Sequence, residues 1–261
     1  MGEIKKALSI AGSDPCAGAG LQADLKTFHA HGVYGLTAVT AVTVQNTQQV
    51  GLVQEMPSKI VRDQIVSLFE DITIQVVKIG MVFSPPIIRS IVQAAKIVDF
   101  PFVVLDPVMV SESGYDLLQE EAQRVLVEEL FPLADLVMPN VHEAERLTGR
   151  SIKAMEDMKS ASRELMEMGP AQVLIKGGHF TGAPGVDVLD LGWKTTELRP
   201  KFVSSSRLHG TGCTYSSAIA ANIALGESLE AAVQKAKDYI SLSIQNYLDI
   251  GMGNPVLKHF V

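Results

Sequence analysis

Short apolar segments alternate with amphipathic segments along almost the whole of this 261-residue chain. The apolar segments have the length of buried strands, and hydrophobic residues recur at helical spacing in the segments between them. The expected strands cover residues 7–11, 36–44, 76–79, 102–105, 136–138 and 173–175, with helical stripes at 21–28, 60–69, 87–95 and 155–168. Because parallel strands need a long connection between them, this order predicts an α/β fold. We expect a mostly parallel central sheet with helices on both faces.

The last part of the chain adds a hairpin and two helices to this pattern. Residues 186–191 and 194–198 flank Gly192 and Trp193 and predict a small antiparallel hairpin. One helix is expected directly after Gly212 and another over 229–248, and residues 122–130 predict a further helix earlier in the chain. The sequence contains no Pro-, Gly- or Ser-rich linker and no internal repeat, so we expect one domain over residues 1–261.

The composition argues against several classes of partner. The net charge is −7 and there is no run of Lys or Arg, which disfavours nucleic acid or an anionic membrane. We expect no signal peptide and no membrane-spanning segment, because the longest apolar runs are too short to cross a bilayer. The two cysteines, Cys16 and Cys213, make no disulfide framework. These features predict a cytoplasmic protein.

Polar and glycine residues follow the expected strands at the ends where parallel sheets bind their ligands. The residues at these strand ends are Gly12, Gln45, Met81, Asp106, Asn140 and Lys176. Because the carboxyl ends of parallel strands share one edge of a sheet, these scattered residues form one candidate site.

The segment 209–214 reads His-Gly-Thr-Gly-Cys-Thr and stands directly before an Ala-rich helix. Its two glycines let the backbone turn tightly. The N–H groups of Gly210, Thr211 and Gly212 then face one point together with the N-terminus of the helix. This arrangement predicts an anion hole for the charge on a transferred phosphoryl group. The alternative is a glycine-rich connection before a well-capped helix.

Cys213 stands in the first turn of the same helix. Helix N-terminal N–H groups favour a thiolate, so we expect a lowered pKa for this thiol. A thiolate at this point is a candidate general base for a substrate hydroxyl. The alternative is a small buried apolar residue, which is what most free cysteines are.

Three further strand ends carry candidate groups for a nucleotide and a metal. Asn140 and Glu143 fit the capping box of a short helix, and Glu143 is also a candidate Mg²⁺ ligand, since this ion prefers one or two carboxylates together with phosphate oxygens. Lys176 stands beside two glycines and can pair with a phosphate, or it is a solvated lysine before a turn. Asp106 can reach a metal or simply end its strand.

The loop 12–20 is rich in glycine but matches neither of two common phosphate motifs. It lacks the Lys-Ser/Thr that ends a P-loop, and it does not have the G-x-G-x-x-G spacing of dinucleotide-binding sites. Asp24, in the following helix, is a candidate carboxylate facing a bound ring. Gln45 offers a donor and an acceptor on one amide, which suits the edge of a pyrimidine or pyridine.

Taken together, these motifs resemble the ribokinase-like superfamily and, within it, the hydroxymethylpyrimidine/phosphomethylpyrimidine kinases of thiamine biosynthesis. The similarity runs nearly from end to end. The matching segments are Ala-Gly-Ser-Asp-Pro at 11–15, Gly-Ala-Gly-Leu-Gln-Ala-Asp-Leu-Lys-Thr-Phe at 18–28, Gln-Asn-Thr at 45–47, Lys-Ile-Gly-Met at 78–81, Leu-Asp-Pro-Val-Met at 105–109, Pro-Asn at 139–140 with Glu143, Lys-Gly-Gly-His at 176–179 and His-Gly-Thr-Gly-Cys-Thr at 209–214.

The resemblance implies a ribokinase-like fold, and ATP-dependent phosphorylation of 4-amino-5-hydroxymethyl-2-methylpyrimidine and then of its monophosphate. It also implies a homodimer. The pyrimidine contacts that it implies are Gly12, Asp24, Gln45, Met81 and Val108. ATP and Mg²⁺ are implied near Asp106, Asn140, Glu143, Lys176, Thr211 and the rest of the 210–213 loop, with Cys213 as the catalytic base.

The chain departs from the family pattern at Cys16 and Ala17, where the family commonly has Ser-Gly. A second thiol close to the site raises the hypothesis that oxidation couples Cys16 to Cys213. The alternative activity is that of a pyridoxal or pyridoxine kinase, as the main or a side reaction. A non-catalytic regulator on the same scaffold is the alternative from another class.

Overall fold

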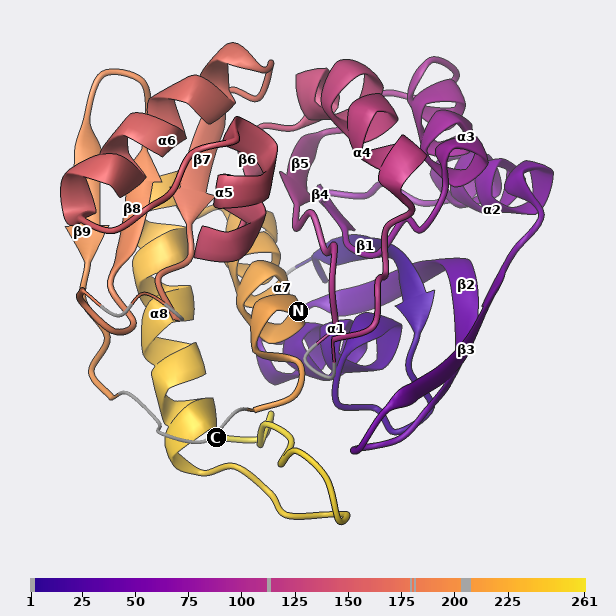
Figure 1. Ribbon diagram of the computed structural model, residues 1–261. Coiled ribbons are helices and arrows are strands. Elements are labelled where there is room, and N and C mark those ends of the chain that lie inside the picture. The colour runs from indigo at the N-terminus through magenta and orange to yellow at the C-terminus, as the bar shows by residue number, and fades with distance from the viewer. Residues whose placement is uncertain (1–2, 112–113, 179, 181, 203–207) are drawn as a thin grey trace.

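The computed structural model describes residues 3–111, 114–178, 180, 182–202 and 208–261. The described residues include six parallel strands at the centre of one sheet. These strands are β1 (Lys6–Ser13), β2 (Tyr34–Gln45), β4 (Val76–Ile79), β5 (Phe102–Leu105), β6 (Leu136–Val137) and β7 (Gln172–Ile175). They lie in the order β2-β1-β4-β5-β6-β7 (Figure 1). The predicted mostly parallel α/β sheet is confirmed.

Antiparallel strands extend the sheet at both ends. At one end β3 (Val50–Glu55) pairs with β2, and at the other β8 (Asp187–Asp190) and β9 (Thr195–Leu198) follow β7. The predicted hairpin at 186–198 is therefore confirmed. The strand β3 was not predicted, because its residues are largely exposed and its hydrophobic pattern is weak.

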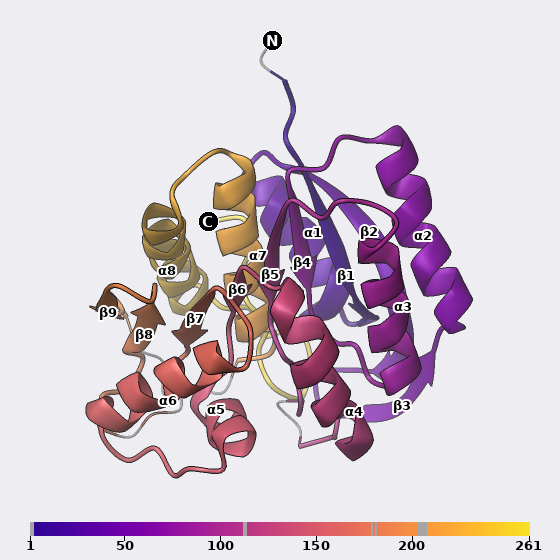
Figure 2. The ribbon, with the colours of Figure 1, turned by 90° about the horizontal axis from the view of Figure 1, so that it is seen from above.

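Helices cover both faces of the sheet, as Figure 2 shows from above. One face carries α1 (Gly20–Ala30), α7 (Thr211–Ala224) and α8 (Leu229–Gln245). The other carries α2 (Ser58–Asp71), α3 (Pro85–Ala95), α4 (Glu120–Val125), α5 (Val141–Thr148) and α6 (Met155–Glu167). A separate hydrophobic core fills the space between the sheet and each helical layer, which is why all four residues of β4 are buried.

Most element boundaries differ from the sequence prediction by one or two residues, and three differences are more informative. The helix expected over 122–130 is α4 followed by one π-helical turn, Leu126–Leu130. The helix expected to reach residue 248 ends at Gln245. The first strand continues to Ser13 through a register shift between Ala11 and Gly12. Bulges of this kind redirect a strand end, and this one lies beside the cavity described below.

Among the described residues, no helix combines the length and apolar character that crossing a membrane requires.

Candidate functional site

A cavity of about 420 Å³ opens where the carboxyl ends of the parallel strands meet the N-terminus of α7. The sequence-predicted residues that line it are Gly12, Gln45, Met81, Asp106, Val108, Asn140, Glu143, Lys176, Gly210, Thr211, Gly212 and Cys213. Asp24 is not among the lining residues. His179, the last residue of the Lys-Gly-Gly-His motif, lies outside the described residues.

Only glycine fits at position 210, the residue before the first turn of α7. Gly210 has φ +84°, and a Cβ atom added to it would lie 1.7 Å from the carbonyl oxygen of Gly18. The hydrogen-bond ladder of α7 begins with the Thr214 N–H, which donates to Gly210 O at 3.0 Å. The ladder therefore leaves the N–H groups of the preceding turn available to an anion.

Lys176 and Asp106 form an ion pair beside this turn. A Cβ atom added to Gly212 would lie 3.2 Å from Asp106 Oδ2 and 3.3 Å from Lys176 Nζ, so the pair contacts the first turn of α7 closely. Burial lowers the pKa of Lys176, but the Asp106 and Glu143 carboxylates outweigh burial and raise the pKa above its ordinary value. Lys176 is therefore charged, and a phosphate that reaches it has to compete with Asp106.

Glu143 has two roles in the structure. It completes the capping box of α5, where Glu143 Oε2 accepts from the Asn140 N–H at 2.7 Å and Asn140 Oδ1 accepts from the Glu143 N–H. It also lies in the cavity near Asp106. Burial, together with the Asp106 charge, raises the pKa of Glu143 to about 7. Two neighbouring carboxylates that repel each other are a donor set that a hard divalent cation fits.

Cys213 lines the cavity with a partly exposed side chain. Burial raises the pKa of this thiol to about 11, and the Asp24 and Asp106 carboxylates act in the same direction. Lys78 and a hydrogen bond from the Gly20 N–H act against them without reversing the shift. The prediction of a lowered pKa is therefore wrong, because the helix N-terminus does not outweigh desolvation. At neutral pH the thiol is protonated.

Asp24 is completely buried behind the wall of the cavity. Its carboxylate forms an ion pair with Lys78, at 2.9 and 3.0 Å, and accepts hydrogen bonds from the hydroxyls of Ser9 and Ser217. The structure does not place this carboxylate facing a bound ring: both of its oxygens have protein partners, and it acts on the cavity through its ion pair with Lys78 and its charge near Cys213.

Lys78 is a cavity residue to which no sequence pattern had assigned a role. It lies on β4, and its side chain is completely buried. Burial lowers its pKa, but the Asp24, Cys213 and Asp106 charges outweigh burial and raise the pKa well above its ordinary value. The sequence does contain a pattern that predicts this ion pair. A lysine between Val77 and Ile79 in a buried strand needs a buried anionic partner.

Gln45 is fixed by a hydrogen-bond network that links distant parts of the chain. One end of its amide lies 3.0 Å from His209 Nε2, and the other lies 3.2 Å from Thr43 Oγ1. His209 Nε2 lies 2.9 Å from Asp14 Oδ2, and Thr43 Oγ1 donates to the Ser13 carbonyl. Sequence reasoning missed His209 and Asp14, because nothing in their spacing indicates that they meet.

Counting protons assigns the orientation of this amide. Thr43 has one hydroxyl proton, which Ser13 O accepts, and His209 Nε2 needs a proton to donate to Asp14. These protons fit an amide with Gln45 Nε2 facing Thr43 and Gln45 Oε1 facing His209, where the single proton on His209 Nε2 is shared between Asp14 Oδ2 and Gln45 Oε1. His209 therefore decides which end of the amide faces each neighbour, and so what the cavity presents to a ligand.

Residues near the C-terminal end of the sequence hold this network in place. The His209 N–H donates to Pro255 O at 2.9 Å, and the Asn254 N–H donates to the carbonyl of Thr47 at 2.8 Å. The segment 254–256 thus joins the end of β2 to the approach to α7.

Ala17, which stands beside Cys16 where the family commonly has glycine, has φ +60°. This left-handed conformation favours glycine, so the alanine is held there under strain by the loop around it. Cys16 and Cys213 are both free thiols in the structure, and the hypothesis that oxidation couples them stays untested.

The other end of the cavity is lined by the apolar side chains of Phe202, Ile240 and Ile244. Beside them, Lys237 Nζ lies 2.6 Å from Asp187 Oδ2, which also accepts from the Tyr215 hydroxyl. The cavity therefore has an apolar end and a polar, glycine-rich end. Two ligands of different chemistry could bind side by side in it.

Comparison with known proteins gives a consistent result. Residues 14–258 match the family model of phosphomethylpyrimidine kinase. The chain is 41% identical to the hydroxymethylpyrimidine/phosphomethylpyrimidine kinase of Aquifex aeolicus, covering 96% of this chain and 98% of that protein. It is 44% identical to the thiamine biosynthesis bifunctional protein ThiED of Geobacter sulfurreducens, but there it spans only 52% of the longer relative.

Solved structures extend the similarity to the fold. The phosphomethylpyrimidine kinase of Clostridium difficile 630 has a TM-score of 0.82 at 44% identity, covering 92% of this chain and 99% of that one. The ADP complex of Bacillus subtilis pyridoxal kinase has a TM-score of 0.90 at 33% identity, covering 98% of both chains.

The buried pair predicts a large effect on stability. Lys78→Met leaves the Asp24 carboxyl group buried and without its cationic partner, so we expect the free energy of unfolding to fall by about 3–5 kcal/mol in urea titrations. Lys78→Met combined with Asp24→Asn should recover most of the loss. The exposed pair Lys194–Glu230 is the matched control, and Lys194→Met should cost less than about 1 kcal/mol. Equal costs for the two lysines would show that Asp24 does not depend on Lys78 for its charge compensation.

Proposed function

Because the chain belongs to the phosphomethylpyrimidine kinase family, we propose that it is the ATP-dependent kinase of 4-amino-5-hydroxymethyl-2-methylpyrimidine and of its monophosphate, in thiamine biosynthesis. The observation that carries the proposal is the meeting of three features around one cavity. These are the N-terminal turn of α7, the charged Lys176 and the Cys213 side chain. An anion hole, a cation for a phosphate and a group for the proton of an alcohol are the parts that phosphoryl transfer to an alcohol needs.

The acceptor is proposed to bind at the end of the cavity formed by β1, β2 and β4. Gln45 offers its amide to the edge of the ring, with its orientation set by His209. Met81 and Val108, which pack in one small hydrophobic cluster, offer apolar contacts to the ring. Gly12 leaves room beside them, because a Cβ atom added there would lie 2.9 Å from Met81 Sδ.

ATP is proposed to bind from the opposite end. Its phosphates would reach Lys176, Asn140 and the N–H groups at Thr211, with Asp106 facing them through a bound cation, while the adenine occupies the apolar end described above. Mg²⁺ fits beside Glu143 and Asp106, where it would neutralise phosphate charge when bound.

Catalysis is proposed to rest on positioning and electrostatics. The turn at 210–212 holds the transferring phosphoryl group, and Lys176 stabilises its charge. Cys213 accepts the proton of the acceptor hydroxyl in the thiolate form. Because the pKa of Cys213 is about 11, the thiolate is the minor form at neutral pH, and Lys78 increases its share.

The alternative acceptor, pyridoxal, is supported by the similarity to pyridoxal kinase structures, and we propose it as a side substrate at most. A coupled assay of ADP release decides between the candidate functions. We expect ADP with the hydroxymethylpyrimidine and with its monophosphate, less with pyridoxal, and none without an acceptor. Faster turnover of pyridoxal would assign the chain to the alternative, and no ADP with any alcohol would indicate a non-catalytic regulator.

Cys213→Ala should keep the affinity for ATP and lower kcat for the pyrimidine by on the order of a hundredfold or more. In the wild type kcat should rise with pH above neutrality, because the reactive form of a thiol with a pKa of about 11 is its deprotonated form. The alanine variant should lose this rise.

Steady-state kinetics and ATP titrations of Cys213→Ala and Cys213→Ser test the assignment. The serine variant keeps a group that can hydrogen-bond to the acceptor hydroxyl, but this group does not ionise readily. It therefore separates two roles of Cys213, orienting the acceptor hydroxyl and accepting its proton. A kcat of the alanine variant within about threefold of wild type would show that the sulfur is not the base.

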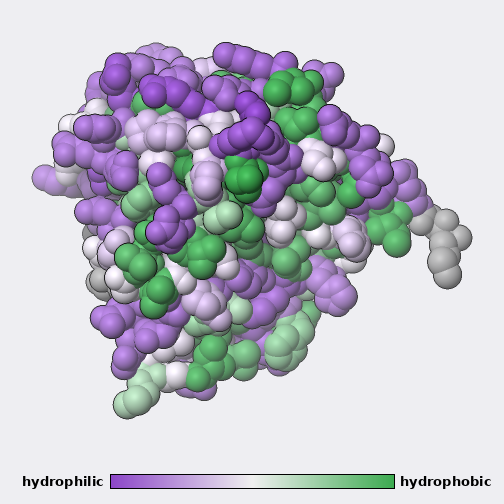
Figure 3. Space-filling model, turned by 90° about the vertical axis from the view of Figure 1, so that its right-hand side faces the viewer, coloured by the Kyte–Doolittle hydropathy of each residue, from purple (hydrophilic) through white to green (hydrophobic). Residues whose placement is uncertain are grey.

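A homodimer through the β2–β3 edge is also proposed. Val44 and Leu52 are cross-strand partners and Val42 lies on the same face, and these side chains are 47–63% exposed. Figure 3 shows hydrophobic areas on the side of the molecule that carries β2 and β3. An apolar strip along an edge strand is a surface that a second copy would cover.

Sedimentation velocity tests the dimer. We expect the wild type to sediment as a dimer and Val44→Lys with Leu52→Lys as a monomer. Ile97→Lys, at a comparably exposed apolar residue outside the β2–β3 hairpin, should remain dimeric. A monomeric wild type would refute the proposed interface.

The proposed location is the cytoplasm, where ATP is available and two free thiols stay reduced.

A further inference from the structure

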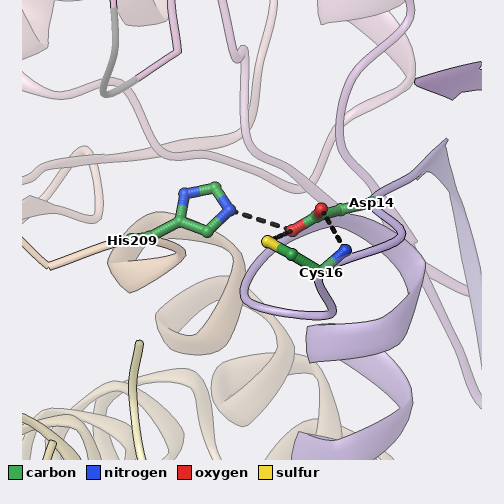
Figure 4. A group of neighbouring side chains, drawn as sticks. All are labelled: Asp14, Cys16 and His209. Atoms are coloured by element: carbon green, nitrogen blue, oxygen red, sulfur yellow. Dashed lines mark hydrogen bonds and ion pairs between the residues drawn. The ribbon is translucent and has the colours of Figure 1, made fainter. Parts of the chain in front are cut away.

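Three side chains with metal-binding atoms meet at one edge of the cavity. They are Asp14, Cys16 and His209, drawn in Figure 4, and their ligand atoms all lie within 4.8 Å of one another. Asp14 Oδ2 lies 2.9 Å from His209 Nε2 and 3.3 Å from Cys16 Sγ. The folded chain brings together residues 195 positions apart in the sequence to make this group.

Backbone hydrogen bonds fix the Asp14 carboxylate and the backbone of His209 in advance. The Asp14 carboxylate accepts from the N–H groups of Cys16 at 3.0 Å, Gly18 at 3.1 Å and Ala19 at 2.8 Å. The backbone of His209 is held by segment 254–256, as described above. Groups that orient the ligands in this way are what preformed metal sites have in addition to their ligands.

In the metal-free protein, the thiol proton of Cys16 and the ring proton of His209 lie between the three side chains, where a cation would bind. The Cys16 thiol and the His209 ring nitrogen both donate to the same oxygen, Asp14 Oδ2. Zn²⁺ can replace both donations. The thiol proton leaves to solvent, the ring proton moves to His209 Nδ1, and bonds form from the metal to sulfur, nitrogen and oxygen. No electron is transferred. A thiolate, an imidazole and a carboxylate together suit zinc, whereas Mg²⁺ prefers oxygen ligands alone.

We propose that Asp14, Cys16 and His209 form a three-ligand Zn²⁺ site whose fourth position opens to the cavity. Asp14 and His209 line the cavity, and Cys16 approaches Asp14 from outside its lining. Open fourth positions are typical of zinc sites that are not purely structural.

Zinc at this site would change the acceptor end of the cavity. Once His209 Nε2 binds the metal, it no longer donates a proton toward Gln45 Oε1, and the amide loses the contact that sets its orientation. Bound Zn²⁺ therefore inhibits the enzyme by weakening the binding of the acceptor alcohol, and it leaves the binding of ATP unchanged. This inhibitory effect rests on the proposed function, whereas the binding of zinc does not.

Metal binding is measured first, without any substrate. The full-length protein is dialysed against a chelator and then titrated with Zn²⁺ in competition with a chromophoric chelator. We expect one Zn²⁺ per chain, bound at least about tenfold more weakly by Cys16→Ser and by His209→Asn. Cys213→Ser and His29→Gln, which alter the other cysteine and an exposed histidine, are the matched controls and should bind as the wild type does.

Cobalt gives a direct signature of the ligands. Co²⁺ in the same site should show near-ultraviolet absorption from the bond to sulfur, absent in Cys16→Ser and retained in Cys213→Ser. Melting curves in chelator check that each variant folds. Zinc affinity unchanged in Cys16→Ser, or a cobalt complex without the sulfur signal, would overturn the site.

Kinetics then test the inhibition. Added Zn²⁺ should raise KM for the pyrimidine more than KM for ATP in the wild type, and it should do so far less in Cys16→Ser. Zinc that binds but leaves both KM values unchanged would overturn the inhibitory effect. A protein that binds zinc at Cys16 but phosphorylates no pyrimidine would refute the proposed function and leave the metal site standing.

Discussion

The ion pair between Lys78 and Asp24 holds together the elements that build the cavity. Lys78 belongs to β4 and Asp24 to α1, and the same carboxylate accepts hydrogen bonds from Ser9 on β1 and Ser217 on α7. Four elements from distant parts of the chain therefore meet at one carboxylate. Ser217 stands one helical turn after Cys213, so the contact also fixes where the sulfur stands. Such a pair contributes little net stability compared with apolar packing, but losing either partner is costly, which makes the arrangement specific.

Two other lysines around the cavity are also paired with carboxylates. Lys176 is paired with Asp106, and Lys237 with Asp187. Each of these lysines is paired locally with a carboxylate, so the charges that line the cavity are paired. A triphosphate must then compete with carboxylates for the lysines, or bring a cation that satisfies those carboxylates.

Sequence patterns predicted much of this architecture for a physical reason. Short buried strands and helical stripes are local signals, and the carboxyl ends of parallel strands must share an edge. Gln45, Asp106 and Lys176 could therefore be placed around one site from the sequence alone. The edge strand β3 was missed because exposed residues leave no periodic apolar signal.

The errors within the site concern electrostatics and long-range contacts. Asp24 was expected to face a ligand, but the sequence does not show that Lys78 occupies both of its oxygens. The pKa of Cys213 was expected to fall, but burial raises it, and burial depends on the whole fold. His209 reaches Gln45 across 164 positions of sequence, and no local pattern indicates that contact.

The hydrogen bonds from residues 254 and 255 to the site have a consequence for how the protein matures. These residues follow every strand of the sheet in the sequence. The strands can therefore pair before this segment docks, and until it docks His209 lacks the backbone anchor that fixes it. Formation of the sheet and completion of the acceptor end are thus separable events, and the second depends on residues 254–256.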